Sequence, residues 1–275
     1  MGLDLPLGEL ALFAVALLGT GAVAGILAGI FGIGGGAVLV PVLYQFLGML
    51  GVDPAVQMHV AVGTSLGIIV PTSVRSFLSH KARGAVDMDL LKSFVIAVPA
   101  GVVLGSIVAA YVSAAGLKGI FAAIAALVAF KMLFGKASWR LGDDLPGVAG
   151  RSFVGVVIGF LSVLMGIGGG VMNNTFMTLF GRPIHQAVAT SAGVGVLISI
   201  PGMFGFIWAG WGAEGLPPLS IGFVNVLAVA LVIPVTILIA PLGVRIAHAL
   251  TKRKLEVGFG IFLLVVATRF LISLF

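Results

Sequence analysis

Two glycine-rich motifs interrupt apolar stretches of this sequence: FGIGGG at 31–36 and MGIGGG at 165–170. Because each glycine costs a helix interior about 1 kcal/mol relative to alanine, three adjacent glycines predict a break in the helix. The helix that leaves such a break presents unpaired N–H groups and the positive end of its dipole, and together these favour an anion. The candidate anion-binding glycines are Gly34, Gly35, Gly36, Gly168, Gly169 and Gly170.

Close packing between helices is the alternative interpretation of the glycines. It suits glycines spaced by one helical turn, such as Gly21 with Gly25 and Gly155 with Gly159. Three adjacent glycines exceed what packing needs, so we favour the turn and the anion site for the two motifs.

Hydroxyl side chains follow both glycine motifs. HVAVGTSLG at 59–67 and HQAVATSAG at 185–193 share six of nine residues, including Thr64 and Ser65 in the first and Thr190 and Ser191 in the second. A hydroxyl can donate a hydrogen bond to an oxyanion. The same hydroxyls can also bond along or across helices, and both interpretations stay open.

Two amides, Asn173 and Asn174, follow the second glycine motif where the first has Leu39 and Val40. Amides in an apolar stretch are costly unless they have a partner. We therefore predict that these amides contact a substrate or line its cavity. The difference between the halves predicts an asymmetric site, with the charged head of the anion nearer the second motif.

Three further residues are candidates for coupling or gating. His59 and His185 occupy equivalent positions, and histidine is the residue type that can carry a proton near neutral pH, although capping a helix or lying at the headgroup level is the alternative. Arg75 could gate the anion or could extend to the membrane surface. No carboxylate lies deep in an apolar segment, and the histidines lack metal-ligand spacing. We therefore predict no catalytic residue, no metal and no cofactor.

The elements that must position these residues are transmembrane helices. Hydrophobic residues make up 60% of the chain and charged residues 9%, and the mean hydropathy is +1.25. A soluble domain needs far more charge, and apolar runs long enough to span a bilayer recur along the chain. The net charge of +6 reflects basic residues gathered in short loops and does not indicate nucleic acid. We predict an all-α integral membrane protein in the lipid bilayer that is not an enzyme.

The matched motifs indicate an internal repeat. We expect a first membrane repeat at 1–134, a cytoplasmic linker at 135–150 and a second membrane repeat at 151–275. The apolar segments run roughly over 8–33, 35–50, 57–79, 90–113 and 117–134 in the first repeat, and over 150–166, 169–181, 186–210, 219–243 and 256–275 in the second.

Basic residues decide how these segments thread the membrane. They gather in three loops, at 81–92, 131–151 and 245–254, which the positive-inside rule places in the cytoplasm. All three lie inside only if each glycine-rich stretch turns back as a hairpin, and the two turns then meet near the midplane. Each repeat is a hairpin plus three crossings, so the second is inverted relative to the first, and both termini lie outside. Lys118 is a basic residue in an outer turn.

These residues resemble the TauE/SafE family of sulfite exporters. The resemblance rests on the paired GIGGG elements, on GTS and ATS after them, on SHKARGAVDMD at 79–89 and on the apolar stretch at 216–250, and it covers nearly the whole chain. It implies a secondary transporter in the bacterial inner membrane, with periplasmic termini, that exports sulfite, sulfoacetate or another organosulfonate by alternating access. A passive anion channel or an uptake permease for another small anion is the alternative. A proton or sodium ion as coupling ion, and a homodimer as assembly, stay open.

Overall fold

The helices follow the predicted apolar segments along most of the chain. A computed structural model of the protein describes residues 15, 17–19, 21–26, 36–135, 140–248 and 251–274. Residues 21–26 are helical. The further elements are α2 (Gly36–Met49), α3 (Pro54–Ala82), α4 (Met88–Tyr111), α5 (Ala114–Phe134), α6 (Val148–Leu164), α7 (Gly170–Leu179), α8 (Ile184–Ala209), β1 (Ser220–Ile221), β2 (Val224–Asn225), α9 (Val226–His248) and α10 (Lys252–Ile272). Among them α3, α4, α5, α8 and α10 are long and apolar enough to cross a membrane.

The segment predicted at 219–243 begins with a β-hairpin instead of a helix. β1 pairs antiparallel with β2, and α9 begins only at Val226. Gly222 lies between the two strands with a φ of +54°, a conformation that glycine adopts readily. The side chain of Asn225 then accepts the N–H of Ala228 and caps the new helix. The prediction of a continuous apolar segment from residue 219 was wrong, because a turn glycine and a capping residue interrupt it.

The second glycine motif is a turn between α6 and α7, and both helices reach the linker. The N–H of Leu141 donates to the carbonyl of Leu179 at the end of α7 (2.8 Å), and α6 starts at Val148, shortly after Leu141. The pair therefore enters and leaves at the same end of the bundle, as a hairpin does. With ten residues, α7 spans about 15 Å, half of the roughly 30 Å of a hydrocarbon core. Residues 31–35, which include the candidates Gly34 and Gly35, lie outside the described residues.

The three basic loops lie at one end of the bundle. Arg253, at the start of α10, donates to the carbonyl of Leu133 at the end of α5. Arg151, at the start of α6, lines one cavity together with Asp87 from the loop between α3 and α4. These contacts join all three loops at the same end, which agrees with the distribution of charge predicted from the sequence.

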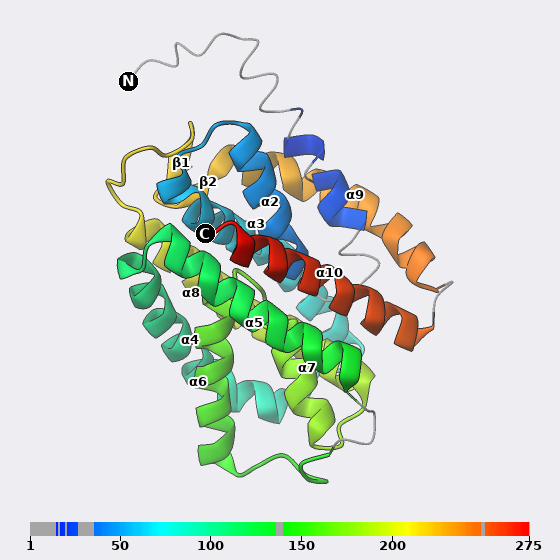
Figure 1. Ribbon diagram of the computed structural model, residues 1–275. Coiled ribbons are helices and arrows are strands. Elements are labelled where there is room, and N and C mark those ends of the chain that lie inside the picture. Colours follow the sequence, from blue (N-terminus) through cyan, green and yellow to red (C-terminus); the bar gives the residue numbers. More distant parts are fainter. Residues whose placement is uncertain are drawn as a thin grey trace.

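Helix α10 lies along α5, and the two run in opposite directions (Figure 1). At the far end from the basic loops, Lys118 of α5 donates to the hydroxyl of Ser273, just after α10 (3.1 Å). The Lys118 ammonium also lies 5.3 Å from the centre of the Tyr44 ring, where a cation is attracted. Ser273 and Tyr44 thus bind the ammonium group of Lys118, the basic residue that the predicted topology places in an outer turn.

Spaced glycines let helices approach closely at two corresponding places. A Cβ added at Gly159 in α6 would collide with the carbonyl oxygen of Val98 in α4, and one added at Gly25 would lie 3.1 Å from Thr236 Cα in α9. Gly25 and Gly159 hold matching positions relative to the two glycine motifs. Val98 and Thr236 hold matching positions relative to the starts of α4 and α9. Packing is therefore the role of these spaced glycines.

We predict that single cysteines at Arg83 and Arg253 react only from the cytoplasm, and one at Ala213 only from outside. The reason is that the basic loops share one end of the bundle and the positive-inside rule assigns that end. The native chain has no cysteine, so an impermeant maleimide reports each site alone in intact cells and in inverted vesicles. Labelling of either arginine position in intact cells would contradict this topology.

Candidate functional site

Helix α6 ends in a turn whose backbone requires glycine. Gly166 and Gly169 have φ values of +62° and +69°, which side chains other than hydrogen disfavour. The N–H groups of Gly166 and Ile167 donate to carbonyls of the last turn of α6, at 3.1 and 3.0 Å, and so satisfy them. Gly169 then caps α7 without a side-chain acceptor. Because glycine has no side-chain oxygen, no capping side chain accepts a hydrogen bond from the first N–H groups of α7.

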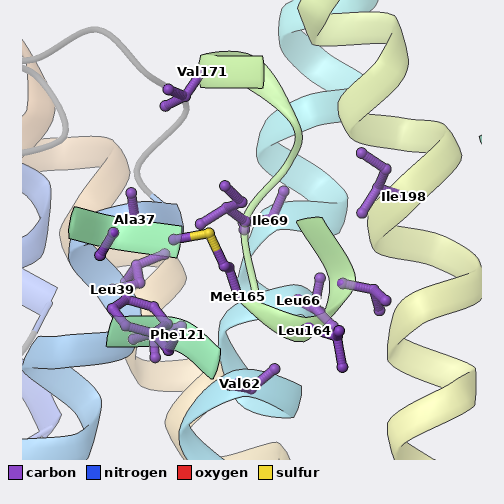
Figure 2. Packing of buried hydrophobic residues seen from close by; sticks show 14 of the residues in the cluster. Ala37, Leu39, Val62, Leu66, Ile69, Phe121, Leu164, Met165, Val171 and Ile198 are labelled. Carbon is purple, nitrogen blue, oxygen red and sulfur yellow. The ribbon is translucent and has the colours of Figure 1, made fainter. Parts of the chain in front are cut away.

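The turn packs against the start of α2 and the centre of α3. A Cβ added at Gly36 would lie 2.8 Å from Ile167 Cα and 3.1 Å from the Gly166 carbonyl oxygen. The hydroxyl of Ser65 donates to the same carbonyl (2.8 Å). Figure 2 shows Ile69 of α3 close to this turn. The described parts of the two glycine motifs therefore touch, and Ser65 binds the backbone of the opposite half.

Three of the predicted site residues form one hydrogen-bonded polar group, which we name the amide cluster: Asn173 and Ser191, which are buried, and Asn174, which is partly buried. Asn173 Nδ2 donates to Ser191 Oγ (2.8 Å), and Ser191 Oγ donates to Asn174 Oδ1 (2.7 Å). Asn173 is fully buried and Ser191 nearly so. Within the described parts of the chain, Asn173 Oδ1 has no hydrogen-bond partner. The cluster lies in the first turns of α7, directly after the glycine turn, so α7 and α8 create a polar place inside the bundle.

A lysine that we assigned to the linker region reaches the same neighbourhood. Lys131 Nζ, in the last turn of α5, donates to Thr175 Oγ1 (2.8 Å), and Thr175 follows Asn174 in the chain. A positive charge here favours an anion nearby. The sequence carried no signal for this contact, because the packing of helices from different repeats brings the two residues together.

Two of the predicted hydroxyls join the halves of the protein. Thr64 Oγ1 accepts the N–H of Asn225 before α9 (3.0 Å), and Thr190 Oγ1 accepts the N–H of Asp87 before α4 (2.9 Å). The side chains of Asp87 and Asn225 each accept a backbone N–H in the first turn of their own helix. Exchanging the matched residues of the two halves converts one contact into the other. We name this pair the crossed contacts.

A serine pair lies between α3 and α8. Ser73 and Ser199 hold matching positions after His59 and His185, and their Oγ atoms are 3.3 Å apart and buried. If a two-fold axis relates the two halves, residues at matching positions that contact each other, such as Ser73 and Ser199, lie on that axis. Sequence reasoning did not single out this pair or Asn225, although a polar residue in an apolar segment was the available signal.

The coupling and gating candidates take other places. His59 Nε2 lies 3.0 Å from the Ala109 carbonyl oxygen and 3.1 Å from that of Val112, so His59 caps the end of α4. His185 and Arg75 are exposed. Among the described residues, no hydrogen bond joins any of the three candidates to the amide cluster. They therefore remain candidates by sequence position alone.

Comparison with known proteins decides the family. A family model described as sulfite exporter TauE/SafE matches residues 17–270. The chain belongs to this family. This TauE/SafE chain is 33% identical over 259 residues to a probable membrane transporter protein of Haemophilus influenzae, covering 93% of this chain and 97% of that protein. A probable membrane transporter protein of Methanocaldococcus jannaschii is 30% identical over 243 residues, covering 88% and 89%.

No solved structure matches the chain. Membership in the TauE/SafE family, together with the five long apolar helices, indicates a multi-pass membrane transporter rather than an enzyme.

The glycine turn yields a matched pair of variants. Gly169→Ala would force a side chain onto a φ of +69° and bring its Cβ to 2.5 Å from Ile198 Cδ1, whereas Gly168→Ala meets Ile69 at 3.3 Å without a positive φ. A left-handed conformation costs a residue other than glycine roughly 1–2 kcal/mol. We expect Gly169→Ala to lower the thermal unfolding midpoint of the purified protein clearly more than Gly168→Ala. Equal midpoints would show that the turn tolerates a side chain at Gly169.

Proposed function

We propose that this TauE/SafE chain is a secondary transporter that moves a small sulfur-containing anion out of the cell. Sulfite, sulfoacetate and other organosulfonates are the substrate class, in line with the description of the family as sulfite exporters. The amide cluster carries the proposal. It is a group of hydrogen-bonding side chains, two of them buried, beside a helix start that has no side-chain cap.

The donors of this region suit an oxyanion. A sulfonate spreads one negative charge over three oxygens and needs several N–H or O–H groups. The backbone N–H groups in the first turn of α7 and the amides of Asn173 and Asn174 can supply them, while the single O–H of Ser191 bonds an amide oxygen and so orients the amides. A half turn of the Asn173 amide would let Oδ1 accept the Ser191 hydroxyl and direct Nδ2 to the anion. Lys131 adds positive charge without entering the cluster.

The crossed contacts support an inverted repeat. Each joins a threonine of α3 or α8 to the backbone in front of a helix of the other half. In the sequence, Ser73 lies between Thr64 and Asp87, and Ser199, with which it pairs, lies between Thr190 and Asn225. Inverted repeats that meet at broken helices are the common plan of secondary transporters. Residues Gly25 and Gly159 pack against α9 and α4 in the same exchanged manner.

The same contacts suggest how access alternates. Both crossed contacts are formed in this structure and Asn173 and Ser191 of the amide cluster are buried, so we assign the conformation as occluded. Opening the contact at Thr190 would expose the cluster toward the basic end, and opening the contact at Thr64 would expose it toward the other end. Because the positive-inside rule places the basic end in the cytoplasm, the first is the inward-facing state and the termini are periplasmic.

We predict that Asn174→Leu and Ser191→Ala weaken sulfite binding and slow sulfite efflux from proteoliposomes. A hydrogen bond to a charged group contributes about 1.5–3 kcal/mol, so loss of one donor should raise the Kd roughly 10- to 150-fold. Calorimetry on purified protein gives the Kd, and flux at imposed pH and sodium gradients gives transport and its coupling ion.

Thr72→Val is the matched control, because the Thr72 hydroxyl bonds only carbonyls of its own helix in the described contacts. It should leave the Kd and the flux unchanged. The Kd for sulfite could instead stay within about threefold of the native value in both cluster variants. That change is far smaller than the loss of one hydrogen bond to a charged group would cause, and it would exclude the amide cluster as the anion site.

A further inference from the structure

We propose that a cavity at the basic end of the bundle is a second anion site, where the organosulfonate binds from the cytoplasm before it reaches the amide cluster. The inference rests on the proposed function and gives it a loading step. The cavity has a volume of about 390 Å³, which is enough for a small organic anion. Its polar lining includes Arg151, Arg182, Gln186 and Asp87.

The two arginines provide the donors. Arg182 Nε is buried and has no hydrogen-bond partner among the described residues, although its Nη2 lies 3.7 Å from a carboxylate oxygen of Asp144. Arg151 Nε donates to the carbonyl of Pro146 (2.7 Å), which fixes its guanidinium at the start of α6. A guanidinium binds the oxygens of a carboxylate or phosphate in pairs, and a sulfonate presents the same geometry.

The carboxylates of the lining are directed to other groups. Asp87 Oδ1 accepts the N–H of Leu90 and caps α4 (3.0 Å). Asp89 Oδ1 lies 3.8 Å from Lys92 Nζ, and the Asp89 side chain is 89% exposed. These contacts leave the guanidinium groups and the amide of Gln186 as the donors for an anion in the cavity.

The cavity lies directly over one of the crossed contacts. Asp87 lines the cavity, and its N–H donates to Thr190, which precedes Ser191 of the amide cluster. Gln186 and Thr190 are four residues apart on α8, so both side chains lie on one face of that helix. Opening the contact between Asp87 and Thr190 would therefore connect the cavity with the amide cluster.

At the other end, the hairpin residues 220–225 beside the corresponding contact carry no charged side chain. There Asn225 Nδ2 donates to the carbonyl of Pro218 (2.8 Å) and to Ser220 Oγ (3.0 Å), and the β-hairpin covers the start of α9. The two halves thus differ where the anion would enter or leave. Arginines at the basic end favour capture there, and the uncharged hairpin at the other end favours release, which matches export.

A single cysteine at Met88 tests the site, because Met88 lines the cavity and the native chain has no cysteine. Purified Met88→Cys protein is treated with a methanethiosulfonate reagent that carries a sulfonate, or with one that carries an ammonium group; each forms a mixed disulfide with the cysteine and releases methanesulfinate. We expect the sulfonate reagent to be favoured and sulfoacetate to protect the cysteine. Arg182→Gln or Arg151→Lys should raise the sulfoacetate concentration needed for protection, by roughly tenfold for Arg182→Gln.

Two matched controls accompany the test. Met49→Cys, an exposed site at the end of α2, should show no protection, and Arg140→Gln, which removes an exposed arginine near the linker, should leave protection of Met88→Cys unchanged. Absence of protection by sulfoacetate, or equal protection in Arg182→Gln, would overturn the cavity as an anion site. Sulfite efflux that still depends on Asn174 would in that case leave the proposed function standing. Protection without any sulfonate or sulfite flux would support the cavity and refute the proposed transport.

Discussion

The structure depends on pairing two backbone N–H groups, in front of α4 and α9, with threonine hydroxyls of the opposite half. Where packing shields a helix start from water, an unpaired backbone N–H costs free energy comparable to a lost hydrogen bond. Asp87 and Asn225 cap their own helices with their side chains. Their backbone N–H groups donate to the hydroxyls of Thr190 and Thr64, respectively. Neither half completes its helix starts alone. The crossed contacts therefore fix how α3 and α8 sit against the helices of the other repeat.

Glycine makes this arrangement compact and gives it a polar centre. Gly166 and Gly169 allow the chain to reverse within the bundle, and the reversal brings a fresh helix start beside α3 and α8. The halves differ directly after this point. Leu39 and Val40 are buried among hydrophobic side chains, whereas Asn173 is buried with a hydrogen bond to Ser191. This asymmetry is consistent with the head of an organosulfonate at the second motif and an organic tail toward the first.

Much of the architecture followed from the sequence. The apolar segments became helices, the second glycine motif became a turn, and the basic loops gathered at one end, because hydropathy, glycine and charge act locally along the chain. Asn173 and Asn174 were predicted to contact a substrate and Ser191 was a candidate, and the structure joins the three by hydrogen bonds. The β-hairpin before α9 was missed because the apolar pattern of the segment was given more weight than Gly222 and the polar residues Ser220 and Asn225.

The roles of individual hydroxyls could not be derived from sequence. Thr64 and Thr190 were candidates either for binding substrate or for bonding across helices, and the structure pairs both with backbone N–H groups, a contact that depends on how the halves pack. The reach of Lys131 to Thr175 has the same origin. Such contacts join residues far apart in the chain, and local propensity does not encode them.

The most direct test of this account is sulfoacetate flux through two cross-linked double-cysteine proteins, each compared with itself after reduction. Alternating access about the serine pair predicts that a short cross-link between Asp87→Cys and Thr190→Cys stops flux and that a reductant restores it. It also predicts that a cross-link between Ser73→Cys and Ser199→Cys leaves flux largely unchanged, because the two halves turn about that point. Undiminished flux with the Asp87 and Thr190 positions cross-linked would contradict the account.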